Sequence, residues 1–181
     1  MKKKIPLLVC ILLALTTLVV SVGCGGGVAG VTKPTVGTVP SGWSLEDDTA
    51  YPQYEGNQPG VDWGLLAYLD SAQSRDVEIW YGDIAPELVG HENDGQALID
   101  YALGEIQASY PYWTPDDTGT IHIDGHLTGY VAGYDPNYGT YDLSIEFISG
   151  ATSVNIYAGS YNGPPLDDTE IMQLINSIHV P

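Results

Sequence analysis

The stretch DLSIEFISGATSVNIYAG, residues 142–159, decides the fold class of this chain. Leu143, Ile145 and Phe147 alternate with polar residues, which is the pattern of a strand with one buried face. Gly150 predicts a tight turn, and residues 153–159 predict a second strand that returns beside the first. Upstream, residues 118–132 read as one long strand and residues 133–139 as the turn that follows it. Together these segments predict an antiparallel β-meander.

Two strands and two helices complete the expected domain. Residues 64–70 and 77–81 predict a pair of antiparallel strands, and residues 96–110 predict a helix with Asp94 as its N-cap. A final amphipathic helix is expected after Asp167 or Asp168, with apolar residues at helical spacing from Ile171 to Ile178. The order strand–strand–helix–three strands–helix predicts an α+β domain. We expect a mainly antiparallel sheet covered by helices, that is, an α/β/α sandwich.

The N-terminal residues have the order of a secretory signal. Lys2, Lys3 and Lys4 precede an apolar run over residues 5–20, and Gly23-Cys24 follows with three further glycines. This ending resembles the lipobox of prokaryotic lipoproteins, although Ser21 stands where that motif usually has Leu. The resemblance implies a signal peptide over residues 1–23 and lipidation of Cys24. The alternative is an uncleaved N-terminal membrane anchor.

The same resemblance implies a location and a domain plan. The protein is expected on the cell membrane or outer envelope, lipid-anchored and facing the extracytoplasmic side. Residues 24–42 are rich in Gly, Val, Thr and Pro, which predicts a flexible tether, and residues 43–181 then form a single α+β domain. The expected partners are the membrane, through the N-terminal lipid, and an envelope protein.

Charge narrows the classes of ligand. From Cys24 onward, two basic side chains, Lys33 and Arg75, stand against 23 acidic ones, so the formal net charge is −21. Such a surface repels polyanions, which excludes direct nucleic-acid binding, and it suits cationic partners, including metal ions. A surface whose acidity only keeps the domain in solution is the alternative. With Cys10 removed and Cys24 lipidated, no thiol remains for a disulfide or for catalysis.

Three segments carry a family resemblance. They are Pro-Ser-Gly-Trp-Ser at 40–44, the glycines Gly125, Gly129 and Gly133, and Ile-Asn-Ser-Ile at 175–178. With the order of elements, these segments resemble the domain shared by PsbP, Mog1 and DcrB-type proteins, over residues 41–181. The resemblance implies a three-layer domain that binds rather than catalyses.

The residues His122, Asp124 and His126 form a candidate metal site. On one continuous strand, all three would project from the same face, and imidazole and carboxylate groups are ligands for Zn²⁺. His91, Glu92 and Asp94 could add ligands if their loop packs nearby. The alternative is a solvated polar face of the sheet, in which case the cofactor, a divalent metal, is absent. The segment Asp135 to Asp142 superficially resembles a calcium loop, but a turn explains its composition better.

Aromatic residues suggest a second candidate surface. The chain has 13 Tyr and 4 Trp but one Phe, and Tyr112, Trp113, Tyr134 and Tyr138 fall in its densest clusters. An ordinary amphipathic core is the alternative. No serine elbow, zinc-protease motif or phosphate loop is present in the sequence. The leading hypothesis is therefore a non-catalytic binding or assembly domain, followed by a metal-binding protein and by a hydrolase of extracellular polymers.

Overall fold

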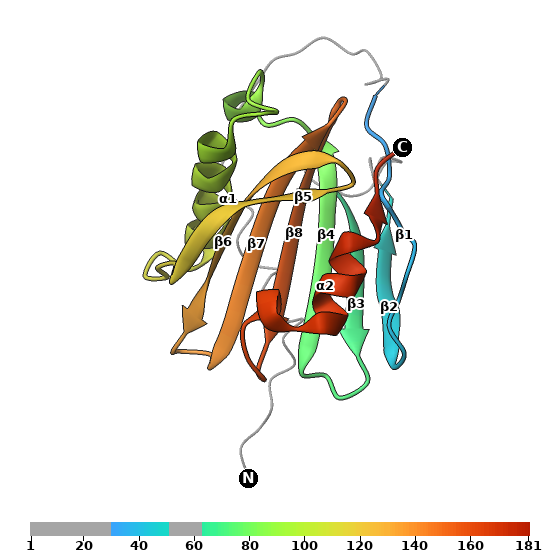
Figure 1. The fold of residues 1–181 in the computed structure, drawn as a ribbon, viewed down its shortest axis with the longest axis vertical. Helices are drawn as coiled ribbons and strands as arrows, with labels where there is room; N and C mark the ends of the chain where they lie inside the picture. The colour runs from blue at the N-terminus through green and yellow to red at the C-terminus, as the bar shows by residue number, and fades with distance from the viewer. Residues whose placement is uncertain (1–29, 51–62) are drawn as a thin grey trace, which may run out of the picture.

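A computed structural model describes residues 30–50 and 63–181 of the chain. Its main feature is a seven-stranded antiparallel sheet with the order β2-β3-β4-β8-β7-β6-β5 (Figure 1). The strands are β2 (Trp43–Thr49), β3 (Trp63–Asp70), β4 (Arg75–Asp83), β5 (Asp117–Ile123), β6 (His126–Asp135), β7 (Thr140–Ser149) and β8 (Thr152–Ser160). The helices are α1 (Gly95–Ser109) and α2 (Thr169–Asn176), with short 3₁₀ turns η3 (Pro86–Leu88) and η4 (Pro165–Asp167). Two short strands, β1 (Thr35–Val36) and β9 (Ile178–His179), pair separately.

One face of the sheet is apolar and lies under α2. Strand β7 pairs with β8 so that Ile145 lies opposite Ile156, and β8 pairs with β4 so that Ile156 also lies opposite Ile79. All three side chains are fully buried. Helix α2 places its buried apolar side chains against this face: Ile171, Leu174 and Ile175. Burial of this apolar surface is the main source of the stability of the domain.

Helix α1 packs on the opposite face, over β5, β6 and β7 (Figure 1). Asp94 caps the helix as the sequence predicts, because its side chain accepts a hydrogen bond from the Ala97 N–H at 3.2 Å. The helix comes so close to β6 that a Cβ on Gly129 would clash with the backbone of Leu98 and Ile99. Glycine at position 129 is therefore a requirement of this packing.

The two helices contact opposite faces, but each covers only part of the sheet. The fold is therefore a sheet-dominated α+β domain, and its helices do not cover the sheet as fully as the predicted α/β/α sandwich requires.

The prediction of one long strand over residues 118–132 is wrong. Asp124 and Gly125 have φ values of 52° and 81°, and they form a two-residue turn between β5 and β6. The sequence pattern also missed the edge strand β2, because its residues are mostly polar and exposed.

Residues 30–42 differ from the flexible tether predicted for residues 24–42. Thr35 and Val36 pair with β9, the Thr38 N–H donates to Ser177 Oγ at 3.0 Å, and Pro34 and Pro40 are buried. The folded domain therefore begins before Trp43.

The predicted signal peptide and Cys24 lie outside the described residues. Among the residues that are described, no helix is long and apolar enough to cross a membrane.

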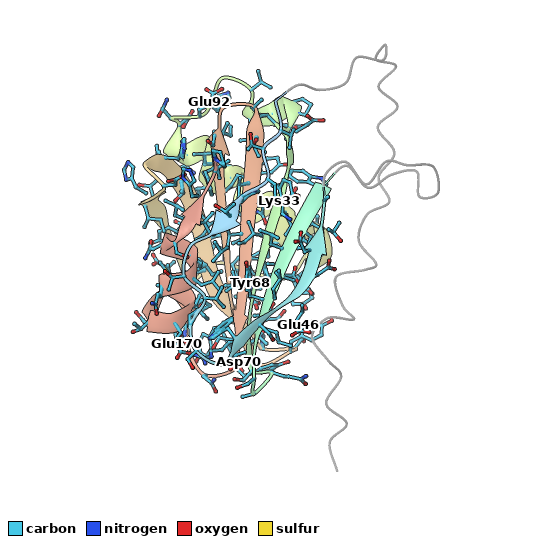
Figure 2. All side chains as sticks on the ribbon, turned by 90° about the vertical axis from the view of Figure 1, so that its right-hand side faces the viewer. Lys33, Glu46, Tyr68, Asp70, Glu92 and Glu170 are labelled. Atoms are coloured by element: carbon cyan, nitrogen blue, oxygen red, sulfur yellow. The ribbon has the colours of Figure 1, made fainter. Side chains whose placement is uncertain are left out.

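Arg75 joins the β3–β4 turn to helix α2. Its guanidinium pairs with Asp70 at 3.1 Å, with Asp168 at 3.1 Å and with Glu170 at 2.6 Å. It also lies 5.2 Å from the centre of the Trp43 ring. Figure 2 shows Asp70 and Glu170 near one end of the domain. Since Asp168 is also the N-cap of α2, one guanidinium fixes the start of the helix to the sheet.

We expect Arg75→Ala to lower the free energy of unfolding by about 2–3 kcal/mol, because Asp70 would remain buried without its cation. Lys33→Ala is the matched control, since Lys33 pairs with Asp48 at an exposed site and its loss should cost less than about 1 kcal/mol. Urea unfolding of the full chain in mild detergent, followed by tryptophan fluorescence, measures both values. Equal losses in the two variants would contradict the role of Arg75.

Candidate functional site

The face of the sheet on the α1 side contains a row of buried acidic residues on its central strands. We call this surface the acidic face and define it by Asp76 and Glu78 on β4, Asp142 and Glu146 on β7, and Tyr157 on β8. The four carboxylate side chains are at most 6% exposed. The register places these residues on one side of the sheet, because Asp76 and Asp142 both lie opposite Gly159, and Glu78 lies opposite Tyr157.

Glu146 is fully buried beside α1. Its Oε1 accepts a hydrogen bond from Ser153 Oγ at 2.5 Å, and its Oε2 accepts one from Asn155 Nδ2 at 3.2 Å. Burial penalises the charged form and raises the pKa of Glu146 to about 8, although these two hydrogen bonds act in the other direction. The carboxyl group is therefore largely protonated near neutral pH.

Glu78 occupies a similar environment on β4. The indole Nε1–H of Trp80 donates to Glu78 Oε2 at 3.0 Å, and the side chain is 6% exposed. Burial raises the pKa of Glu78 to about 7. The ring of Trp80 is partly exposed on the same face, so this part of the acidic face borders solvent.

Asp76 and Asp142 share a row across Gly159, which contributes no side chain between them. The Tyr157 hydroxyl donates to Asp142 Oδ1 at 2.8 Å, whereas Asp76 Oδ1 is buried and has no hydrogen-bond partner. Burial, followed by the negative charges of Glu78 and Asp142, raises the pKa of Asp76 well above its ordinary value. Burial also raises the pKa of Asp142. An unpartnered buried acceptor costs about 1–3 kcal/mol, so burial of Asp76 at this place lowers the stability of the fold.

Over residues 30–50 and 63–181, no Lys or Arg side chain lies on this face. Lys33 and Arg75 are the only Lys or Arg residues after Cys24, and both pair with other carboxylates. His91 contacts Asp94 and His179 contacts Asp124, at the N-cap of α1 and at the β5–β6 turn. Among these described residues, none therefore neutralises the carboxyl groups of the acidic face, and protons or a ligand can do so.

The predicted metal-site residues do not share a face. The turn at Asp124-Gly125 separates His122 on β5 from His126 on β6, and the two lie in adjacent rows of the hairpin with opposite orientations. His126 stacks on the Phe147 ring with the centroids 5.9 Å apart, while the Asp124 carboxylate accepts from His179 Nδ1 at 2.9 Å. The prediction that the three side chains share a face is wrong because the chain reverses direction at Asp124 and Gly125.

His91 and Asp94 contact each other at 3.1 Å, at the N-terminus of α1, and Glu92 accepts from the Gly90 N–H. They do not join the residues of the β5–β6 turn in a common cluster. Across residues 30–50 and 63–181, no group of three or more His, Cys, Asp or Glu side chains is placed to hold a metal ion.

The four aromatic residues of the second candidate surface are also divided. Tyr112 and Tyr138 are about half exposed and contact Tyr110 from two sides, with centroid distances of 6.4 Å and 5.7 Å. Trp113 is 2% exposed and belongs to the core under α1, so it cannot line a surface. The rings of Tyr134 and Tyr141 contact each other, with centroids 4.9 Å apart, on the face of the sheet opposite α1.

The segment after β6 is a turn, as its composition indicates. Asp135 Oδ1 accepts from the Asn137 N–H at 2.8 Å, and the Asp135 carbonyl accepts from the Gly139 N–H at 2.7 Å. The Asp135 side chain thus holds its own turn, and its other oxygen accepts from the Tyr112 hydroxyl at 3.2 Å.

The sequence pattern did not predict that the carboxyl groups of the acidic face are buried. Its signal is an acidic residue between two apolar ones in the middle of a strand, as in Val77-Glu78-Ile79 and Ile145-Glu146-Phe147. Such alternation ordinarily marks a solvated face, so the residues are read as exposed. Only the packing of α1 and the pairing of seven strands reveal that these carboxyl groups are buried.

Comparisons with known proteins give distant similarities only. No protein-family model matches the chain, and neither does any curated protein sequence. A solved protein structure from Bacteroides thetaiotaomicron has 14% sequence identity and a TM-score of 0.47, over 82% of this chain and 45% of that chain. LpqN, involved in cell envelope biogenesis of Mycobacterium tuberculosis, has 14% identity and a TM-score of 0.42, over 82% of this chain and 84% of its own.

The extracellular domain of PknH from the same mycobacterium has 8% identity and a TM-score of 0.29, over 81% of this chain and 82% of that chain. The two mycobacterial structures are thus a cell-envelope protein and an extracellular domain. At these identities and TM-scores, the similarity carries no argument about function. The candidate site therefore rests on the residues of this chain alone.

The raised pKa values predict an unusual dependence of stability on pH. The pKa of a glutamate in the unfolded chain is near 4.5, so between that pH and about 8 the folded state holds protons that the unfolded state has released. The contribution of Glu146 to stability is therefore fully present at low pH and is lost as the pH rises toward 8. We expect the free energy of unfolding to fall over this range by up to about 1.4 kcal/mol per pH unit for each such group.

Glu146→Gln removes this group while leaving a similar shape. Urea unfolding at several pH values from about 5 to about 9 should show a shallower fall for this variant than for the unaltered chain. Glu46→Gln, at an exposed position of β2, is the control and should keep the original slope (Figure 2). A slope that is the same in all three proteins would show that Glu146 titrates in the same way when folded and unfolded.

Proposed function

We propose that this protein is a membrane-tethered, extracytoplasmic binding domain without catalytic activity, and that the acidic face is its ligand site. The observation that carries the proposal is the set of four buried carboxyl side chains on one face, among which Asp76 Oδ1 has no partner. Burial raises the pKa of all four groups, the charges of Glu78 and Asp142 further raise that of Asp76, and such groups are costly to bury.

Stability alone does not account for this arrangement. The opposite face of the same strands is filled by apolar residues, among them Ile79, Ile145 and Ile156, so the fold accepts an apolar layer at these strands. Replacing buried charged groups by apolar residues is often neutral or stabilising in proteins. The acidic residues therefore serve a role that apolar residues cannot fill, and ligand binding is such a role.

The ionisation of the carboxyl groups favours binding over hydrolysis. A glycoside hydrolase needs one protonated carboxyl group and one ionised carboxylate near each other. Here burial raises the pKa of all four groups, so nothing separates an acid from a base. The resemblance of residues 41–181 to PsbP, Mog1 and DcrB-type domains, which implies binding, agrees with this proposal.

The N-terminal sequence supports the tether. A basic start, an apolar run and Gly23-Cys24 have the order found in lipoprotein precursors. Two or more acyl chains on Cys24 would hold the chain stably at a bilayer, since each buried methylene contributes about 0.8 kcal/mol. The domain would then present its acidic face outside the cytoplasm, where envelope proteins and small molecules can reach it.

The tether is tested by expressing the full chain in a bacterium with an alkyne-labelled fatty acid. We expect the unaltered chain to incorporate the label and to sediment with membranes, and Cys24→Ser to lose both properties. Cys10→Ser is the matched control and should behave like the unaltered chain, because Cys10 lies inside the apolar run. Label that persists in Cys24→Ser would refute lipidation at Cys24.

The binding face is tested with a thermal-shift panel of amines, carboxylic acids, saccharides and amino acids, applied to the full chain in mild detergent. We expect at least one class to raise the melting temperature, because a ligand that binds only the folded state stabilises it. Trp80→Ala should remove the shift, and Tyr134→Ala, an aromatic truncation on the other face, should keep it. A panel without any stabilising compound, or equal loss in both variants, would contradict the proposal.

A further inference from the structure

We propose that the acidic face binds a primary ammonium group carried by a small organic cation, and that Asp76 is the residue that accepts it. This inference rests on the proposed function and names the chemistry of its ligand. The geometry that supports it is the row formed by Asp76, Gly159 and Asp142, with Tyr157 beside it on the same face.

Asp76 is the group that lacks a partner. Its side chain is 6% exposed, and its Oδ1 makes no hydrogen bond, although buried carboxylate oxygens in proteins nearly always do. Only a donor can satisfy this oxygen. A donor on a ligand would give this oxygen the hydrogen bond that no protein group supplies.

The groups that face Asp76 favour a cationic donor. They are Glu78 on β4, Asp142 on β7 and Tyr157 on β8, with Tyr110 at the end of α1 close to Tyr157. Asp70 lies on the other face of the sheet, where Arg75 engages it, and the Tyr157 hydroxyl already donates to Asp142. The carboxyl groups of Glu78 and Asp142 beside the unpartnered Asp76 oxygen favour a positively charged donor over a neutral one.

The geometry favours an ammonium over other cations. A guanidinium binds best to two carboxylate oxygens side by side, whereas the Asp76 oxygen that is fully buried without a partner is Oδ1, which suits a single ammonium N–H. In the described part of the chain no cluster is arranged for a metal ion. The partly exposed rings of Trp80 and Tyr157 lie on the same face, and aromatic rings attract ammonium groups.

Binding should couple to proton release. The empty face favours protonated carboxyl groups, while a bound ammonium favours the ionised form of Asp76 and of its neighbours Glu78 and Asp142. Each bound cation therefore displaces a proton into the solvent. As a result, affinity should rise as the pH is raised from about 5.5 to about 8.

The test is isothermal titration calorimetry on the full chain in mild detergent, with cadaverine and Nα-acetyl-lysine methylamide as probes. Cadaverine represents a free diamine, and the capped lysine represents a lysine side chain of a peptide. Nα-acetyl-norleucine methylamide is the neutral control. We expect at least one amine to bind, the norleucine compound not to bind, and Asp76→Asn to weaken amine binding by about tenfold or more.

Asp167→Asn is the matched charge control, because Asp167 is exposed on η4, and amine affinity should be unchanged in it. Equal weakening in both variants would show diffuse attraction to the acidic surface and overturn the inference. Should Asp76→Asn fail to fold, titration of the unaltered chain in two buffers of different ionisation enthalpy decides, and binding without proton release overturns the inference. If another class in the thermal-shift panel binds at the acidic face while amines do not, this inference fails and the proposed function stands.

Discussion

The pairing of β7 with β4 through β8 is the interaction on which the rest of the structure depends. Because side chains alternate along each strand, this pairing sorts the residues of three strands into two chemically different layers. Ile79, Ile156 and Ile145 form a row on one face, and the acidic residues collect on the other. Helix α2 completes the apolar layer, and α1 borders the acidic one. A register shift by one residue would exchange the two layers and destroy both the core and the candidate site.

The scarcity of basic residues gives this two-faced sheet its electrostatic character. Arg75 lies on the apolar side of the sheet, where its salt bridges with Asp70, Asp168 and Glu170 connect α2 to the sheet. Lys33 forms an exposed salt bridge with Asp48. Within the part of the chain that the structure describes, the acidic face therefore has no counter-charge, and burial raises the pKa values of its carboxyl groups. This is a state that costs stability as the pH rises, and a cationic ligand would relieve it.

Much of the secondary structure could be predicted from local pattern. The strands at residues 64–70, 77–81 and 142–149 and the Asp94-capped helix appear where periodicity and capping residues place them, within slightly longer observed strands. The errors have physical causes. His122, Asp124 and His126 were assigned to one strand because the turn formed by Asp124 and Gly125 interrupts a continuous β-favouring sequence. Strand β2 is mostly polar, and its extended conformation depends on pairing with β3, so its own sequence pattern does not predict a strand. Trp113 looked like a surface aromatic, but the packing of α1 buries it.

The sequence by itself determined the strong charge imbalance, the alternation of the central strands, the helix start at Asp94 and the N-terminal order that predicts a lipidated Cys24. These are local or compositional properties, so they can be read one segment at a time. The tertiary structure alone decided which carboxyl groups are buried, since Asp76 and Asp142 are 66 positions apart and meet only because β8 pairs with both of their strands. It also decided that His122 and His126 face apart and that residues 30–42 join the domain. Burial and register depend on contacts between distant segments, and the chemistry of the acidic face follows from them.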